Sequence, residues 1–269
     1  TLHYYTILLA CDKIALTGRG EPMNTYKTSE IAAAIGVHPN TVRLYEELGL
    51  IPKPQRLPNG YRVFTELHVE QFRLARLAFR VEVLQNGLRK KIVQMVKSAA
   101  AGNFSTALLL TQEYIAQIQQ ERANAEEAIQ IVRQILSGTP QKNLHLFKRK
   151  EVSEYLGISM DTLRNWEMNG LLAVRRRQNG YRVYTDKDLQ RLKVIRSLRC
   201  ANYSLEAILG LLSQLSQNPD VDIKAALNTP KADETIIAVC DRLLTSLSAA
   251  EENAKQMLCM LQGMKAANS

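Results

Sequence analysis

Two long stretches of the chain carry apolar side chains at the spacing of a pairing helix. In residues 106–137 and 233–265, core positions recur at alternating steps of three and four. This spacing is typical of a coiled-coil seam, because it keeps one stripe of a helix facing its partner. Both stretches are therefore predicted to be long helices. The first seam comprises Leu108, Thr111, Ile115, Ile118, Arg122, Ala125, Ile129, Val132 and Leu136, and the second comprises Ile236, Cys240, Leu243, Leu247, Ala250, Ala254, Met257, Leu261 and Met264.

A shorter pattern precedes each seam, and it occurs twice. Residues 26–64 return in modified form as residues 147–184. Gly36, Arg43 and Gly49 recur at one constant spacing as Gly157, Arg164 and Gly170, and one residue is then missing from a loop. The chain is therefore predicted to contain one module in two copies.

The first copy predicts two short helices around a tight turn. Thr28 can cap the first helix, and Gly36 breaks it. A new helix begins at Pro39, since proline at the first helical position loses no needed hydrogen bond. Gly49 supplies the left-handed residue that ends this helix. The apolar faces are Ile31, Ala34 and Ile35 on the first helix and Val42, Tyr45 and Leu48 on the second.

The second copy repeats this pattern with different chemistry. Its first helix carries Val152, Tyr155 and Leu156 on the apolar face, and Gly157 marks the turn. Ser159 is a better helix cap than the aligned His38. Each copy is therefore predicted to contain a helix-turn-helix.

A hairpin and a further helix are predicted to close each module. Asn59-Gly60 and Asn179-Gly180 precede short β-branched or aromatic runs, and Asn-Gly is the strongest short hairpin signal. Amphipathic helices follow at Val69–Leu84 and Leu189–Leu198. Each module is thus expected to be a winged helix-turn-helix.

These patterns predict the domain organisation of the chain. Ser137 to Gln141 contain Gly and Pro, which stop a helix and leave a joint. The expected parts are an N-terminal extension at 1–23, a first module at 24–105, its long helix at 106–137, a linker at 138–146, a second module at 147–232 and a second long helix at 233–265.

Composition limits the class of protein. A net charge of +9 over 269 residues suits a polyanionic partner, although a merely soluble basic protein would also show it. Cys11, Cys200, Cys240 and Cys259 form no zinc-type cluster, so we expect neither a metal nor another cofactor. No apolar run reaches the roughly 18 residues of a membrane helix. We expect a cytoplasmic, nucleoid-associated protein without a membrane partner.

The motifs in both modules resemble one family. Thr41 to Glu46, Thr162 to Glu167, Gly-Leu after each, and Asn-Gly-Tyr-Arg before the second wing strand are similar to motifs of the MerR transcription factors. The resemblance implies a mainly α fold with two winged helix-turn-helix domains, each followed by a long antiparallel coiled-coil helix. It also implies a bacterial regulator that binds double-stranded promoter DNA, distorts an overlong spacer and works with RNA polymerase. Relatives usually carry one module per chain and form homodimers.

The residues supply a physical case for DNA binding. Arginines near the start of an exposed helix can contact guanine or phosphate, and arginines of a wing can meet the backbone. Tyr61 and Tyr181 can donate hydroxyls to phosphate, or their rings can pack the wing against the helix. Tyr45 aligns with Trp166, and core packing is the stronger interpretation for both. The candidate DNA contacts are Thr41, Arg43, Tyr45, Tyr61, Arg62, Thr162, Arg164, Arg176, Tyr181 and Arg182.

Three alternatives stay open. Metal-sensing or thiol-sensing is one, although Cys240 lies on the second seam, where a thiol acts as a small hydrophobe. A DNA-independent coiled-coil interaction protein is another. A small-molecule effector bound between a module and the seam is a third. We do not expect an enzyme, because the four histidines stand apart and no phosphate loop or nucleophile motif occurs.

The duplication predicts an unusual stoichiometry. Because both seams lie on one chain, the effective concentration of each seam around the other is on the order of millimolar. This favours pairing within the chain. Antiparallel pairing would place Arg122 near the small Ala250, with Glu251 or Glu126 at the edge. The expected state is a monomer folded as a pseudo-dimer, and the alternative is a homodimer. The seam residues proposed to carry the pairing are Leu108, Ile115, Ile118, Arg122, Ile129, Val132, Leu243, Leu247, Ala250, Met257 and Leu261.

Overall fold

The computed structural model describes five segments of the chain, residues 25–80, 87–137, 145–178, 180–216 and 232–268. The predicted N-terminal extension, most of the linker and Asn179 lie outside them. The described residues form two compact units. Unit 1 contains residues 25–80, 87–118 and 249–268, and unit 2 contains residues 119–137, 145–178, 180–216 and 232–248.

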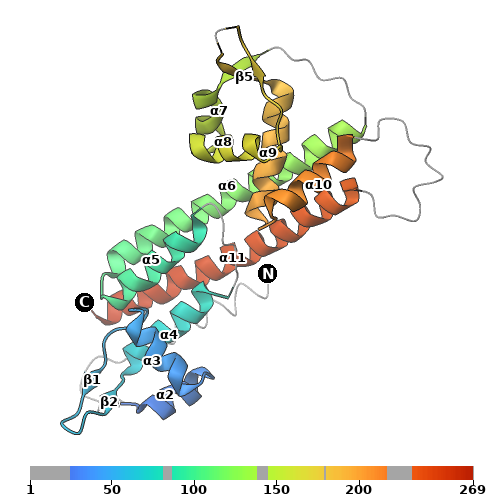
Figure 1. Cartoon of the computed structure of the whole chain (residues 1–269). Helices are drawn as coiled ribbons and strands as arrows, with labels where there is room; N and C mark the ends of the chain where they lie inside the picture. Colours follow the sequence, from blue (N-terminus) through green and yellow to red (C-terminus); the bar gives the residue numbers. More distant parts are fainter. Residues whose placement is uncertain (1–24, 81–86, 138–144, 179, 217–231, 269) are drawn as a thin grey trace. The chain divides into compact units, whose positions relative to one another are not determined.

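Unit 1 begins with the first module (Figure 1). Helices α2 (Thr28–Ile35) and α3 (Pro39–Glu47) are followed by strands β1 (Gln55–Arg56) and β2 (Arg62–Val63), which pair antiparallel. Helices α4 (Glu66–Ala78) and α5 (Leu88–Ala100) come next. The unit is completed by the first half of α6 (Phe104–Leu136) and the second half of α11 (Ala232–Ala267).

The turn between α2 and α3 has the predicted glycine, but its cap differs from the prediction. Gly36 follows α2 with φ 70°, in the left-handed region that favours glycine. Thr28 is not the cap of α2. Lys27 holds that position, and its backbone N–H donates to the Glu30 carboxylate at 2.7 Å. The Glu30 side chain, at the third helical position, therefore caps the start of the helix, a role that we predicted for Thr28.

The first module packs around a small apolar core. Phe64 and Phe72 are fully buried among residues of α2 and α3, and the Tyr45 ring stacks on Phe72 at 5.3 Å between centroids. Leu48 was predicted on this apolar face, but 49% of it is exposed. Leu48 is the C-cap residue of α3, so the helix ends before its side chain can turn inward. The core residues are Ile31, Ala32, Val42, Ile51, Phe64, Val69 and Phe72.

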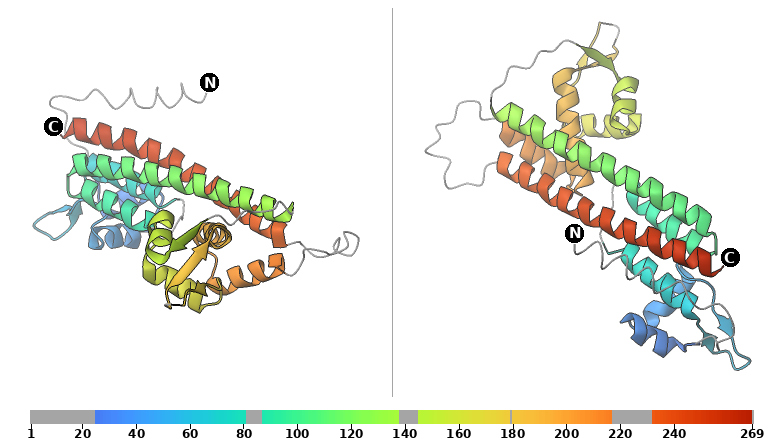
Figure 2. Two further views of the ribbon diagram at one scale, coloured as in Figure 1. Left: turned by 90° about the horizontal axis from the view of Figure 1, so that it is seen from above. Right: turned by 180° about the vertical axis from the view of Figure 1, so that it is seen from behind.

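Unit 2 contains the second module and both remaining helix halves (Figure 2). Strand β3 (Leu146–Lys148) leads into α7 (Arg149–Leu156) and α8 (Met160–Met168). Strands β4 (Arg175–Arg176) and β5 (Arg182–Thr185) follow, and β5 lies between β3 and β4 in a three-stranded antiparallel sheet. Helices α9 (Asp186–Cys200) and α10 (Leu205–Ser216) pack the module against the second half of α6 and the first half of α11.

The core of unit 2 joins the module to both long helices. Trp166 is 4% exposed, and the same cluster contains Ile129 and Val132 of α6 with Ile236 and Cys240 of α11. These residues pair the end of α6 with the start of α11. In unit 1 the order is complementary, because the start of α6 shares a pocket with the end of α11.

Tyr155 does not lie in this core, although the helical pattern placed it there. It is 63% exposed. Its hydroxyl accepts a hydrogen bond from Lys193 Nζ at 2.9 Å, and the same ammonium lies 4.8 Å from the ring centroid. Burial alone would lower the pKa of Lys193, but hydrogen bonds to Glu127 and Tyr155 raise it. The aromatic ring therefore covers a lysine on the surface and not the apolar interior.

The predicted seams differ in how fully they are buried. Every seam position of α11, from Ile236 to Met264, is buried. In α6, Leu108, Ile115 and Arg122 are half-buried. Leu136 is 47% exposed, so its burial was wrongly predicted. It is the last residue of its helix. Arg122 and Ala250 belong to different units, so their contact stays a prediction.

Candidate nucleic-acid interface

The solvent-exposed face of helix α3 carries both polar and apolar side chains. Arg43 is exposed, and its Nη1 donates to Asn40 Oδ1 at 3.1 Å one turn earlier. Leu44 follows with 49% of its surface exposed. Thr41 is half-buried behind them, and the His38 side chain accepts the Asn40 backbone N–H at 3.2 Å. The cap and the Asn40 side chain thus fix the start of the helix that carries Arg43.

Helix α8 presents the matching face in unit 2. Arg164 and Asn165 are exposed at the positions aligned with Arg43 and Leu44. Ser159 caps the helix, because its Oγ accepts the Thr162 backbone N–H at 3.0 Å. The Thr162 hydroxyl lies 2.9 Å from the same oxygen, and its side chain is half-buried. Thr41 and Thr162 therefore support the starts of the two helices.

The arginine of each hairpin is tied to the preceding helix. Arg62 Nε lies 2.5 Å from a Glu46 carboxylate oxygen, and Arg182 Nε lies 2.6 Å from Glu167. The two glutamates are 9% and 8% exposed. We predicted that these arginines contact the DNA backbone, and that contact stays a prediction. Each guanidinium is held against its module because a nearly buried carboxylate needs a cation.

The role of these two glutamates was not predicted from the sequence. Their signal was their occurrence at matched positions, directly after Tyr45 and Trp166. Tyr184 also donates its hydroxyl to Glu167, and burial together with this hydrogen bond raises the pKa of Tyr184 well above its ordinary value. Arg182 and Tyr184 of the unit 2 hairpin thus both donate hydrogen bonds to one carboxylate of α8, that of Glu167.

The outer surface of each hairpin carries tyrosine and arginine. Tyr61 and Tyr181 are 68% and 73% exposed, which favours contact with a ligand over packing under the hairpin. Arg176 is exposed beside Arg175 and Arg177. The first module has one arginine in the aligned strand, Arg56, and it lies 3.6 Å from Glu46. The second hairpin is therefore the more basic.

Two of the aromatic candidates lie inside the modules. Tyr45 is half-buried against Phe72, and Trp166 is nearly fully buried. This geometry favours the packing interpretation of Tyr45 over a direct base contact.

Three cysteines lie within the described segments, and each is a free thiol. Cys200 and Cys240 are buried, Cys259 is exposed, and burial raises the pKa of Cys240 to about 12. Within the described segments, no group of three or more His, Cys, Asp or Glu side chains has the geometry to hold a metal ion. Among the described helices, none is long and apolar enough to span a membrane.

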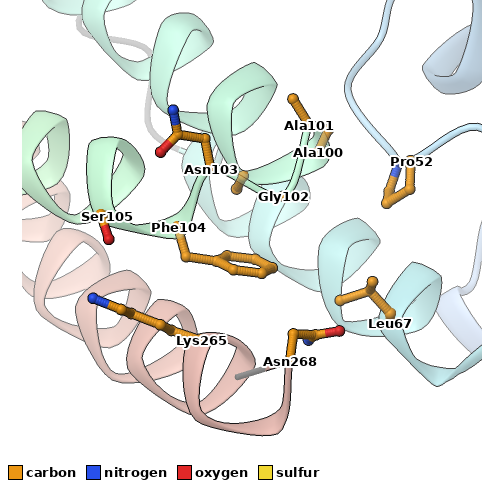
Figure 3. Close-up of a pocket in the computed structure, with 11 residues that line it drawn as sticks. Pro52, Leu67, Ala100, Ala101, Gly102, Asn103, Phe104, Ser105, Lys265 and Asn268 are labelled. Carbon is orange, nitrogen blue, oxygen red and sulfur yellow. The ribbon is translucent and has the colours of Figure 1, made fainter.

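Unit 1 contains a pocket of about 530 Å³ beside its first module (Figure 3). Its wall includes Pro52 and Leu67 of the module, the turn from α5 to α6, Lys265 of α11, and Asn268, which follows that helix. The Phe104 ring extends from the start of α6 towards Leu67. The lining combines apolar side chains with four polar residues, Asn103, Ser105, Lys265 and Asn268.

Each of the two modules is a helix-turn-helix followed by an antiparallel strand pair that is tied to its second helix. This arrangement defines the class of protein. Both modules match models of one family. Residues 27–64 match the MerR family regulatory protein model, and residues 147–215 match the MerR HTH family regulatory protein model. The chain therefore resembles the MerR family of regulators and carries two MerR-type modules in tandem.

Curated relatives match over part of the chain. The mercuric resistance operon regulatory protein of Bacillus cereus is 41% identical over 46 residues, which are 17% of this chain and 35% of the relative. The transcriptional regulator ZntR of Escherichia coli is 38% identical over 69 residues, 25% of this chain and 49% of the relative. The transcriptional activator mta of Bacillus subtilis is 32% identical over 129 residues, 44% of this chain and 48% of the relative. The chain thus spans less than half the length of these relatives. No solved structure matches.

Proposed function

We propose that the protein is a sequence-specific DNA-binding transcription regulator that contacts duplex DNA through both modules. The observation that carries this proposal is the repeated arrangement of an exposed arginine on the second helix and a carboxylate-held arginine on the following hairpin. A single arginine is usually a solvated surface charge. The same arrangement at matched positions in two modules indicates one shared ligand.

Each element has a defined role in this proposal. Helices α3 and α8 enter major grooves, where Arg43 and Arg164 contact guanine or phosphate. The hairpins are wings, and their arginines and tyrosines contact the phosphate backbone. Glu46 and Glu167 hold the wing arginines through Nε, so a phosphate oxygen can approach the two terminal nitrogens. The carboxylates thereby position the contacts before DNA binds.

The wider regulatory role follows from the resemblance. We propose that the protein binds a promoter operator in the cytoplasm, distorts the spacer and acts with RNA polymerase. One relative is named for mercuric resistance, which supports a regulator that responds to an effector. The pocket beside Phe104 offers room for a small organic effector.

We also propose that the two long helices pair within one chain as an antiparallel coiled coil. The support comes from each unit separately. Ile129 and Val132 share a core with Ile236 and Cys240, while Phe104 lines a pocket with Lys265. One chain would then present two modules to one operator, as a homodimer does with one module per chain.

The wing assignment makes a prediction about salt. The logarithm of the affinity falls linearly as the logarithm of the salt concentration rises. Replacing Arg62 or Arg182 by alanine should reduce the steepness of this fall by about 0.9 each, because each substitution removes one phosphate contact. Titrations of a fluorescent operator at several salt concentrations measure this slope. Arg133→Ala, on an exposed position of α6, is the control and should leave the slope unchanged. Unchanged slopes in both wing variants would show that the wings do not contact DNA.

Pairing within the chain makes a prediction about mass. Light scattering during size-exclusion chromatography should give a dominant species near 30.3 kDa, the mass of one chain. Pairing of two first seams between chains would bring two Arg122 side chains together, and like charges disfavour that arrangement. A dominant species at twice the monomer mass that persists on dilution to nanomolar concentration would contradict the pseudo-dimer.

A further inference from the structure

The two proposed recognition helices differ most where their exposed faces align. Leu44 of α3 and Asn165 of α8 occupy the same position, directly after Arg43 and Arg164. Both side chains are exposed. One turn later, Leu48 aligns with Asn169, and both are exposed as well. One helix therefore presents a pair of leucines to solvent where the other presents a pair of asparagines.

The asparagine pair is organised before any ligand binds. The Asn169 Nδ2 donates to the Asn165 backbone oxygen at 2.8 Å and to the Asn165 Oδ1 at 2.7 Å. The Asn165 amide is thereby oriented with its Nδ2 away from Asn169. An amide oxygen has two lone pairs, so Oδ1 can accept a second hydrogen bond while Nδ2 donates.

The leucine pair has the opposite chemistry. Leu44 is 49% exposed and Leu48 is 49% exposed, although neither contributes to the core of the first module. Two large apolar side chains one turn apart can contact an apolar surface of a ligand. In the major groove, that surface is the C5-methyl group of thymine.

Each chemistry selects a different base. An asparagine amide pairs bidentately with adenine, donating to N7 and accepting from N6. A leucine can contact a thymine methyl but forms no hydrogen bond with any base edge. The two half-sites would then differ at the base pair next to the shared arginine contact.

We propose that Leu44 and Asn165 are the residues that make the two half-sites different, Leu44 through a thymine methyl group and Asn165 through adenine. This inference rests on the proposed DNA-binding function and deepens it. Leu48 and Asn169 are positioning or supporting residues, and Asn169 acts through its hydrogen bonds to Asn165. The operator is an imperfect palindrome for this reason.

The test is selection of bound sequences from random duplex DNA with the full chain and its variants. Wild-type protein should select a consensus with one thymine-specified and one adenine-specified half-site. Leu44→Asn should change the first half-site towards adenine, and Asn165→Leu should change the second towards thymine. In direct titrations, mutating the selected adenine should weaken wild-type binding roughly 5- to 150-fold and weaken Asn165→Leu binding much less. Leu109→Asn alters an exposed leucine on α6 and should leave the consensus unchanged.

The results of this selection distinguish a failure of the residue assignment from a failure of the proposed DNA-binding function. If wild-type protein enriches a specific sequence but Leu44→Asn and Asn165→Leu leave both half-sites unchanged, the residue assignment is wrong and the DNA-binding function stands. A fully symmetric wild-type consensus would also overturn the assignment. If no DNA is enriched by wild-type protein, the proposed function falls and the inference falls with it.

Discussion

Replacing Glu121 by alanine is expected to lower the stability of unit 2 by about 3–5 kcal/mol, because it leaves a buried cation without its partner. Arg196 Nη1 and Nη2 meet the two Glu121 carboxylate oxygens at 2.6 and 2.8 Å. The two side chains are 11% and 4% exposed. Arg196 Nε also donates to the Leu156 carbonyl at 2.7 Å. The arginine is thus held against α7 as well as against Glu121 of α6.

The measurement can be restricted to unit 2. Trp166 is the single tryptophan of the chain and lies in the core of that unit. Its fluorescence during urea unfolding reports the transition of unit 2, even where unit 1 unfolds separately. Glu121→Ala should shift this transition to a markedly lower urea concentration. The double variant Glu121→Met with Arg196→Met should recover much of this stability, since apolar side chains of similar size carry no unpaired charge.

A matched control lies on the same helix. Glu126 is exposed on α6, so Glu126→Ala changes the charge of the chain equally without uncovering a buried cation. Its effect should be within about 0.5 kcal/mol. If the Glu121→Ala and Glu126→Ala transitions coincide, the ion pair does not hold the second module to α6.

Neutralising Arg175, Arg176 and Arg177 together is expected to weaken DNA binding on the order of 100-fold at physiological salt. The physical reason is the charge difference between the two hairpins. Arg175, Arg176 and Arg177 follow one another in the second hairpin, whereas the aligned positions of the first hairpin contain one arginine, Arg56. The second module is therefore expected to supply the larger share of the phosphate contacts.

Salt titrations of R175Q/R176Q/R177Q test this expectation. The slope of log affinity against log salt should fall by about 2 to 3, since removing each phosphate-binding arginine lowers it by about one. Arg56→Gln in the aligned strand of the first module is the matched variant. It should change the slope by about one or less, because it removes a single arginine. Equal effects of the triple and single variants would contradict an unequal division of the phosphate contacts between the modules.

The sequence by itself determined the parts of this protein that depend on local chemistry. The duplicated module is visible in residues such as Gly36 and Gly157, since both helices need a left-handed residue where they end. The second seam was predicted position by position, and every one of those positions is buried. Helical period and backbone preference act over a few residues, so a single sequence contains the information that specifies them.

The tertiary structure decided which charged and aromatic side chains meet. The partner of Arg62 is Glu46, and the partner of Arg196 is Glu121. Tyr155 lies against Lys193 and not in the core. Each of these contacts joins different elements, and its geometry depends on how those elements pack. A helical pattern places a side chain on a face, but only packing determines what lies opposite. For that reason the arginines of the candidate interface could be named from the sequence, while the carboxylates that position them could not.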